Sequence, residues 1–220
     1  MLGKVLRRLL SVFVDLGDLT DGDVLVFDTS SLSHAFEGFS HAAISAYLEM
    51  KEPRVWGRLK DRLMRRIGSE EVSRKVILRC DTNRCLMPVG VYKELRAVPA
   101  FSESLDVVTT GGQNVVRRYV MRKSGRGNPI GFPTVFKPRI LIKDARKDLI
   151  DYVLATAHMM GKHISRQDAE GIALAIETGG VLVTADKKQA EVADRMGAKV
   201  LYTMPTKKKE KLPVTLGRSP

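Results

Sequence analysis

The sequence is poor in the residues that build common small metal sites and disulfide frameworks. It has 2 cysteines, Cys80 and Cys85, in the spacing C-x4-C. Two thiols cannot form a four-cysteine zinc site, and we expect both to be reduced. The 4 histidines show no metal-ligand spacing, so we expect them to be surface or structural residues: His34, His41, His158 and His163.

Long apolar runs are also missing. No run of about 18 apolar residues is present, so the sequence predicts no membrane-spanning helix. The apolar run 9–14 follows basic residues, as in a signal peptide. It is short and ends at Asp15, which favours an amphipathic helix over 1–22 instead. There is no internal repeat, and we expect a cytoplasmic protein.

The formal charge is strongly positive. The 220 residues carry 37 Lys and Arg against 25 Asp and Glu, a net charge of +12. Basic surfaces suit polyanions such as RNA, DNA or acidic lipid. The alternative is a basic protein with no such partner. A hydrophobic content of 44% is ample for a core, and the length predicts one domain, with or without an insertion.

One segment, 165–186, organises the chain. Ser165 can cap a helix that ends at a Gly-Gly pair, because glycine accepts left-handed backbone geometry. The apolar β-branched run 181–184 then predicts a buried strand. Asp168 lies in the first turn of the helix, and Asp186 lies just beyond the strand. The segment therefore supplies a carboxylate at each end of a helix–strand unit.

Two other segments carry acids in similar places. The segment 23–32 predicts a buried strand that ends at Asp28, and 86–95 predicts a strand end, a proline and a helix that carries Glu94. Ligands of open α/β sheets bind beyond the carboxyl ends of parallel strands. Four carboxylates gathered there would repel one another unless a divalent cation neutralised them. Hard oxygen ligands suit Mg²⁺ or Mn²⁺.

Each acid also has a purely structural interpretation. Asp168 can complete a capping box with Ser165, and Asp186 can cap the helix that follows it. Glu94 can pair with a neighbouring base on the surface. Asp28 is the hardest to explain in this way, because it ends an apolar strand before Thr-Ser-Ser. Together, the four acids favour a metal site.

Two stretches concentrate the positive charge. Residues 54–84 have a net charge of +6 and predict either a solvated helix face or RNA contact. Residues 115–148 have a net charge of +8, with glycines, prolines and a few aromatics, and predict an RNA-binding loop or a disordered surface insertion. Lys187 and Lys188 can contact a scissile phosphate or be solvated. The predicted RNA-binding residues are Arg117, Arg118, Arg122, Lys123, Arg126, Lys137, Arg139, Lys187 and Lys188.

The remaining elements complete an α/β pattern. We expect a main domain over 23–205, an insertion over about 97–163 and a basic flexible tail over 206–220. Residues 99–142 are the least regular. The other predicted helices are 41–50, 55–67, about 18 residues ending near 160, and 188–196; the other predicted strands are 76–78, 86–87 and 198–202.

The motifs together resemble the PIN-domain family. They are F-D-T-S-S, P-V-G-V-Y-K-E-L, D-A-E-G-I-A-L-A-I-E and L-V-T-A-D, in that order. The resemblance implies an α/β/α sandwich around a central parallel sheet and a metal-dependent ribonuclease. It places Asp28, Glu94, Asp168 and Asp186 at the family's four acidic positions. It also implies hydroxyls near these acids, at Thr29, Ser30 and Thr184.

The motifs M-P-V-G-V-Y-K-E-L and S-R-Q-D-A-E are similar to those of one branch of that family. The branch holds the small protein-only RNase P enzymes, homologues of the Aquifex enzyme, which trim 5′ leaders from precursor tRNA. This resemblance covers residues 23–32, 86–95 and 165–202. It implies an additional acid two residues after the third, which Glu170 matches.

The implied function is divalent-metal-dependent endoribonuclease activity, with 5′ maturation of precursor tRNA as the favoured reaction. Asp28, Asp168 and Asp186 would bind the metal directly, and Glu94 would bind a second ion or hold a water. The alternatives are a VapC-like toxin ribonuclease and a non-catalytic RNA-binding PIN protein. PIN domains often self-associate, and the N-terminal helix is the candidate surface for a homo-oligomer.

Overall fold

The fold is an α/β/α sandwich around a five-stranded parallel sheet. The computed structural model describes residues 13–37, 40–110 and 140–204. The strand order is β3-β2-β1-β4-β5, and every pair is parallel. The fold class predicted from the sequence is confirmed, and the architecture is consistent with a PIN-like sandwich. The strands are β1 (Val24–Phe27), β2 (Arg84–Pro88), β3 (Ile140–Lys143), β4 (Val181–Thr184) and β5 (Lys199–Tyr202).

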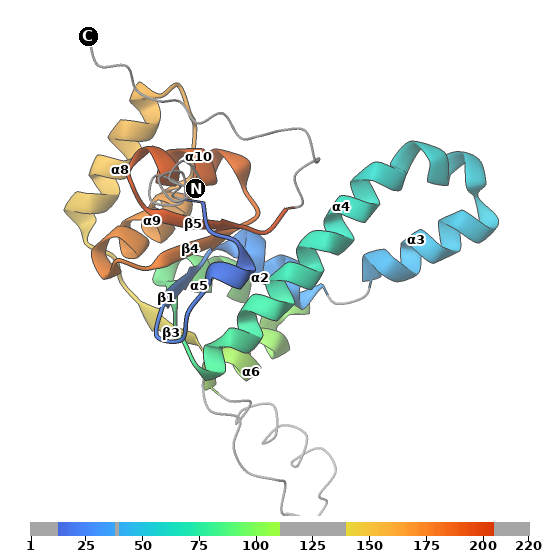
Figure 1. The fold of residues 1–220 in the computed structure, drawn as a ribbon, viewed down its shortest axis with the longest axis horizontal. Helices are drawn as coiled ribbons and strands as arrows, with labels where there is room; N and C mark the ends of the chain where they lie inside the picture. Colours follow the sequence, from blue (N-terminus) through green and yellow to red (C-terminus); the bar gives the residue numbers. More distant parts are fainter. Residues whose placement is uncertain (1–12, 38–39, 111–139, 205–220) are drawn as a thin grey trace, which may run out of the picture.

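The two faces of the sheet bury alternate residues of each strand. Leu25 and Phe27 of β1 pack into one core, whereas Val26 packs into the other. Helices α8, α9 and α10 cover the Val26 face, and Figure 1 shows them together on one side of the sheet. They span Lys147–Met159, Arg166–Thr178 and Lys187–Arg195. The opposite core is built with α2 (Thr29–Phe36), α4 (Pro53–Leu78), α5 (Val89–Arg96) and α6 (Ser102–Thr110).

The strand order reverses between β1 and β4. From β1 the chain adds β2 and then β3 on one side, and it returns to add β4 and β5 on the other. Val26 is paired with Leu182, and Phe27 with Val183. In open α/β sheets the crevice at such a reversal, beyond the carboxyl ends of the strands, is where ligands bind. The residues that follow Phe27 and Thr184 therefore lie at the edge where a ligand would bind.

A long helical hairpin projects from the sandwich. It consists of α3 (Ser40–Lys51) and α4, which is 26 residues long and has Pro53 in its first turn. Figure 1 shows the pair extending away from the sheet. The strand predicted at 76–78 is wrong, because α4 continues to Leu78. Val76 is fully buried while Leu78 is 61% exposed, so this short apolar run lies on an amphipathic helix.

The stretch 99–142, predicted to be the least regular, contains regular structure at both ends. A 3₁₀ turn at Pro99–Phe101 leads into α6, and β3 forms the edge of the sheet. Leu141 and Ile142 are exposed on that edge. The helix predicted at about 18 residues is α8, which has 13.

Cys80 and Cys85 form a disulfide bond, contrary to the prediction of two reduced thiols. Cys80 lies in a 3₁₀ turn (Arg79–Asp81), and Cys85 lies in β2. The turn between them brings the two Cα atoms to 5.6 Å, within the range that a disulfide requires. The sequence separation alone could not show this geometry.

The predicted N-terminal helix falls mostly on residues 1–12, outside the described residues. Phe13 forms a parallel bridge with Val200 of β5, and Val14 donates a backbone hydrogen bond to the same residue at 2.9 Å. The chain is therefore extended at 13–14 rather than helical, and a short 3₁₀ turn (Leu16–Asp18) follows. Within the described ranges, no helix combines the length and the apolar character needed to cross a membrane.

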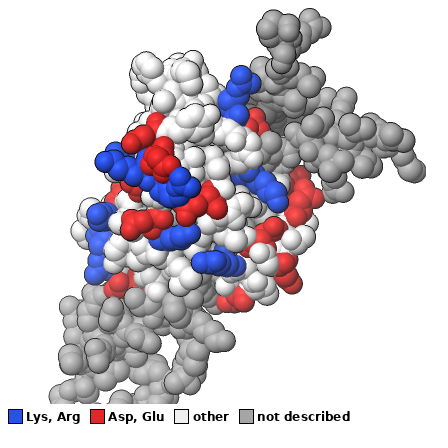
Figure 2. Space-filling model, turned by 90° about the vertical axis from the view of Figure 1, so that its left-hand side faces the viewer, with Lys and Arg blue, Asp and Glu red and all other residues white. Residues whose placement is uncertain are grey.

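The net positive charge of the chain comes from residues outside its described part. Segments 1–12, 111–139 and 205–220 hold 15 of the 37 Lys and Arg but one of the 25 Asp and Glu. The described residues therefore carry 22 basic and 24 acidic side chains, a net charge of −2. Figure 2 shows both signs interspersed on one face of this part. The basic character comes from segments at the two ends and from the insertion.

Candidate functional site

The segment 165–186 folds as its sequence predicts. Ser165 caps α9 with its side chain, and Gly179 ends the helix in the left-handed conformation at φ 62°. Strand β4 then runs over the four predicted residues and is buried throughout. Asp168 completes the capping box by accepting a hydrogen bond from the Ser165 backbone N–H at 2.8 Å. The capping interpretation of Asp168 is therefore correct, and it engages only one of the two carboxylate oxygens.

Asp28 lies at the end of β1 and is 1% exposed. It is also the N-cap of α2, because its Oδ2 atom accepts the Ser30 backbone N–H at 3.0 Å. The Ser30 hydroxyl donates to the same oxygen, and the Thr184 hydroxyl donates to it at 3.2 Å. Ser30 and Thr184 thus lie beside the acid, where the sequence places two of its three predicted hydroxyls.

Thr184 connects Asp28 to the next acid. As well as donating to Asp28, its hydroxyl oxygen accepts the Asp186 backbone N–H at 2.9 Å. The Asp186 carboxylate caps α10 by accepting the backbone N–H groups of Lys188 and Gln189. Asp28 and Asp186 therefore follow two neighbouring strands at the reversal of the sheet, and one buried hydroxyl joins their environments.

Gln189 is a site residue that the sequence analysis missed. It is fully buried, and its Nε2 atom donates to the Asp168 backbone carbonyl at 3.0 Å and faces Asp28 Oδ1 at 3.4 Å. Its Oε1 atom is buried with no hydrogen-bond partner. The pattern D-K-K-Q, an acid followed three positions later by glutamine at a helix start, was the available signal.

The surroundings of Asp28 and Asp168 raise the pKa of both acids. Burial raises the pKa of Asp28 to about 6, and the charge of Asp168 adds to this, while hydrogen bonds from Ser30 and Thr184 oppose it. Burial also raises the pKa of Asp168, and the charges of Asp186 and Glu94 raise it further. The four carboxylates are therefore close enough to influence one another electrostatically.

Ion pairs within the described part of the chain do not relieve this repulsion. Among the described residues, none of the four acids forms an ion pair with a Lys, Arg or His side chain. A buried carboxylate in such a setting is costly unless another charge compensates it. The arrangement can therefore accept a cation.

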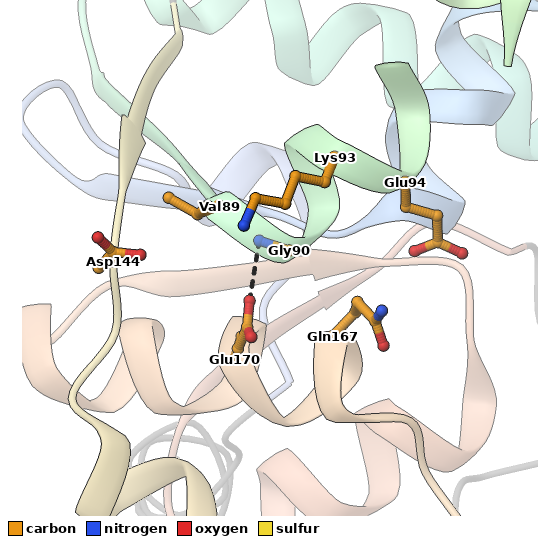
Figure 3. A pocket seen from close by; sticks show the side chains of 7 residues that line it. All are labelled: Val89, Gly90, Lys93, Glu94, Asp144, Gln167 and Glu170. Atoms are coloured by element: carbon orange, nitrogen blue, oxygen red, sulfur yellow. Dashed lines mark hydrogen bonds between the residues drawn. The ribbon is translucent and has the colours of Figure 1, made fainter. Parts of the chain in front are cut away.

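Glu94 and Glu170 lie on the rim of an adjoining cavity. Glu94 is exposed on α5 and accepts a hydrogen bond from the Thr29 hydroxyl at 2.8 Å. Glu170 accepts the Gly90 backbone N–H at 2.9 Å, as the dashed line in Figure 3 shows. A Cβ atom at Gly90 would approach the Glu170 carboxylate to 2.2 Å, so this contact requires glycine.

The cavity between α5 and α9 has a volume of about 510 Å³. Figure 3 shows the side chains of Lys93 and Glu94 pointing from α5 toward Gln167 and Glu170 on α9. Asp144, directly after β3, contributes an acid that the sequence analysis did not identify. The lining residues are Val89, Gly90, Lys93, Glu94, Asp144, Gln167 and Glu170. The cavity is large enough for one nucleotide-sized group beside the acids.

The spacing of the acids limits how they could hold an ion. No three of Asp28, Glu94, Asp168, Glu170 and Asp186 have ligand atoms that all lie within 4.8 Å of one another; of the described residues, only another group does. Mg²⁺ commonly keeps several waters and binds through one or two carboxylates. The residues fit an ion held partly through water.

That other group consists of Glu37, His41 and Glu70, and it could bind a metal ion. Glu37 follows α2, His41 lies in the first turn of α3, and Glu70 is fully buried in α4. The sequence analysis expected His41 to be a surface or structural residue and did not single it out as a possible ligand. Glu37 is four positions away, but Glu70 is 29 positions away and only the fold brings it to His41.

Comparison with known proteins adds no assignment. No family model matches the chain, and no curated protein matches it. The positions of the side chains therefore carry the functional interpretation.

The predicted RNA-binding residues divide into two groups. Lys187 and Lys188 are exposed in the first turn of α10, directly after Asp186. The others lie outside the described residues, in the segment 111–139: Arg117, Arg118, Arg122, Lys123, Arg126, Lys137 and Arg139.

Two substitutions of Asp186 separate its structural role from its proposed chemical role. Asp186→Asn keeps an oxygen that can cap α10, whereas Asp186→Ala removes the cap and should lower the free energy of unfolding by about 1 kcal/mol. Under the metal-dependent ribonuclease function proposed below, both variants should lose metal-dependent cleavage but only the alanine variant should lose stability. Urea denaturation and a cleavage assay check this pair. Cleavage retained by the asparagine variant would limit Asp186 to its capping role.

Proposed function

We propose that the protein is a divalent-metal-dependent endoribonuclease of the PIN-domain kind. The observation that carries this proposal is the convergence of Asp28, Asp168, Asp186 and Glu94 at the reversal of a parallel sheet, where burial and mutual repulsion raise the pKa of two of them. The order of the four motifs in the sequence supports the same assignment.

The preferred ion is Mg²⁺ or Mn²⁺, because the candidate ligands are all carboxylates. Asp28, Asp168 and Asp186 would hold it, with Glu94 and Glu170 on the open side. When bound, the ion supplies charge stabilisation at the scissile phosphate and lowers the pKa of water in the site. The cleavage products expected from the resemblance are a 5′-phosphate and a 3′-hydroxyl.

The chain's own residues prepare this site. Ser30 and Thr184 fix the Asp28 carboxylate through Oδ2, so that Oδ1 faces the interior near Gln189. The capping contacts hold Asp168 and Asp186 in place before any substrate arrives. Such preorganisation avoids rearrangement of the acids during the reaction.

RNA is the proposed substrate class, and precursor tRNA is the favoured substrate. The described part carries a net charge of −2, so attraction to a polyanion must come mainly from the basic segments elsewhere in the chain. Lys187, Lys188 and Lys93 are the cations nearest to the acids in sequence or in the cavity. The proposal therefore assigns chemistry to the sandwich and most of the RNA affinity to the basic segments.

The experiment that tests the proposal is a cleavage assay. Purified protein with Mg²⁺ or Mn²⁺ is mixed with a 5′-labelled precursor tRNA and with an unstructured RNA. The control is the double variant Asp28→Asn/Asp186→Asn. A single cut at the mature 5′ end, lost in the control, supports the tRNA reaction. Cuts elsewhere that depend on the acids support a different ribonuclease. No metal-dependent cut in either RNA would contradict the proposal.

Neutralising the insertion should reduce RNA affinity without removing the acids. In a variant with Arg117, Arg118 and Arg122 changed to glutamine, we expect weaker binding and a smaller salt dependence. The slope of log K against log salt should fall by about 0.7 for each phosphate of single-stranded RNA that the variant no longer neutralises. Fluorescence anisotropy over a salt series measures it. A change of Arg54 and Arg58 on α4, which removes two positive charges rather than three, tests whether another basic stretch has the same effect per charge.

A further inference from the structure

We propose that Glu37, His41 and Glu70 form a second metal site, specific for a transition-metal ion such as Zn²⁺, at the base of the α3/α4 hairpin. This site is separate from the acids at the sheet and does not depend on the proposed ribonuclease function. The three residues come from the end of α2, the start of α3 and the body of α4. A bound ion would therefore join the hairpin to the sandwich.

The candidate ligand atoms lie close to one another, and the hydrogen bond between His41 and Glu70 would have to open to admit an ion. His41 Nδ1 is 2.5 Å from Glu70 Oε1 and 3.5 Å from Glu37 Oε2, and all three atoms lie within 4.8 Å of one another. Two carboxylates and one imidazole make a donor set that zinc sites use, often with a fourth position left open. Imidazole favours Zn²⁺ over Mg²⁺, which prefers oxygen in octahedral geometry.

Glu70 gives an independent sign that this cluster takes a ligand. It is 0% exposed, and its second oxygen, Oε2, is buried with no hydrogen-bond partner among the described residues. A fully buried carboxylate with one unsatisfied oxygen is unfavourable unless a cation compensates it. Arg66 and His41 both approach the other oxygen, Oε1, whereas a divalent ion would also compensate the buried Oε2 atom.

A cavity provides the open side of this site. It has a volume of about 600 Å³ and reaches both Glu37 and His41. Its other lining residues are four apolar side chains and two arginines: Ile44, Leu59, Leu63, Met204, Arg62 and Arg66. An ion could enter from this side and keep a water or another ligand at its remaining position.

Arg66 would compete with a metal ion for the Glu37 carboxylate. Its Nη2 atom lies 2.6 Å from both carboxylate oxygens of Glu37, and its Nε atom lies 3.9 Å from Glu70 Oε1. The guanidinium neutralises Glu37 and would have to release one oxygen when an ion binds. Removing this positive charge should therefore strengthen metal binding, whereas removing a ligand should weaken it.

The test is isothermal titration of Zn²⁺ into the full chain carrying Asp28→Asn/Asp186→Asn, so that the acids at the sheet contribute little. We expect one site whose affinity falls 10-fold or more in His41→Ala or Glu37→Gln, by analogy with the loss of other metal-site interactions. Arg66→Gln should raise the affinity. His163→Ala, which removes an exposed imidazole elsewhere, is the matched control and should change nothing.

A second measurement keeps the test decisive where a variant fails to fold. Glu37→Gln keeps the size and shape of a partly buried side chain, and circular dichroism verifies that the variant folds. Co²⁺ in place of Zn²⁺ gives a visible spectrum that reports imidazole and carboxylate ligation. Absence of Zn²⁺ binding, or binding unaffected by the ligand variants, would mean that the cluster is only a hydrogen-bonded ionic network. Mg²⁺ binding as tightly as Zn²⁺ would overturn the proposed specificity.

Discussion

Replacing Asp28 with asparagine is expected to lower the rate of metal-dependent RNA cleavage by about 10²-fold or more, since several kcal/mol of charge stabilisation is lost at 1.36 kcal/mol per factor of ten. The variant keeps the shape of the side chain and an oxygen for the Ser30 backbone N–H. The lower rate should therefore reflect the missing charge. Single-turnover cleavage of labelled RNA with Mn²⁺ measures it.

The matched control lies at the other end of the same strand. Asp23 precedes β1 and accepts hydrogen bonds from the Thr20 backbone and hydroxyl, far from the acids that follow β1 and β4. Asp23→Asn makes the same chemical change and should leave the cleavage rate unaltered. If Asp28→Asn cleaves as fast as the unsubstituted protein, the proposed site is wrong.

The same substitution is expected to stabilise the metal-free protein at neutral pH. Burial raises the pKa of Asp28 to about 6 from its ordinary value of 3.8, so the folded state binds more protons than the unfolded state between these values. Stability from this group therefore falls as pH rises through about 6. Asparagine carries no charge and avoids this loss. The stability gain of the variant should grow with pH and reach at most about 3 kcal/mol.

His34 shows why the comparison must be a difference between two proteins. Burial, and then the charge of Arg66, lowers the pKa of His34 to about 4. A histidine with a lowered pKa makes stability rise with pH over nearly the same range, opposite to Asp28. It does so in both proteins and cancels in the difference.

Urea denaturation in EDTA at pH values from about 4 to about 7 measures this gain. Adding Mn²⁺ should stabilise the unsubstituted protein more than the variant and so reduce the gap, because the ion compensates the Asp28 charge. A gap that does not change with pH would show that Asp28 is not the group that titrates.

The sequence predicted the parts of the site that local patterns encode. Asp28 and Asp186 follow short apolar β-branched runs, and Asp168 completes a capping box with Ser165, so their positions could be deduced from neighbouring residues. The sheet order and the approach of β1 to β4 require long-range pairing, which the sequence supported only through the family resemblance.

The residues that were missed depend on tertiary contacts. Gln189 acts through the backbone of Asp168 and the side chain of Asp28, which are 21 and 161 positions away. Glu70 meets His41 only because α4 folds back along α3. The edge strand β3 was missed for a different reason, since its apolar run, 140–142, is only three residues long and lies close to Pro138 between Arg139 and Lys143.

The pairing of β1 with β4 also has a consequence for folding during synthesis on the ribosome. The hydroxyl of Thr184 and the carboxylate of Asp28 meet across 156 positions of chain. Contacts between such distant residues form late, because a long loop must close before they are made. A nascent chain therefore exposes Asp28 to solvent until α10 has been synthesised. The carboxylate cluster therefore cannot assemble before the chain has been synthesised through Asp186.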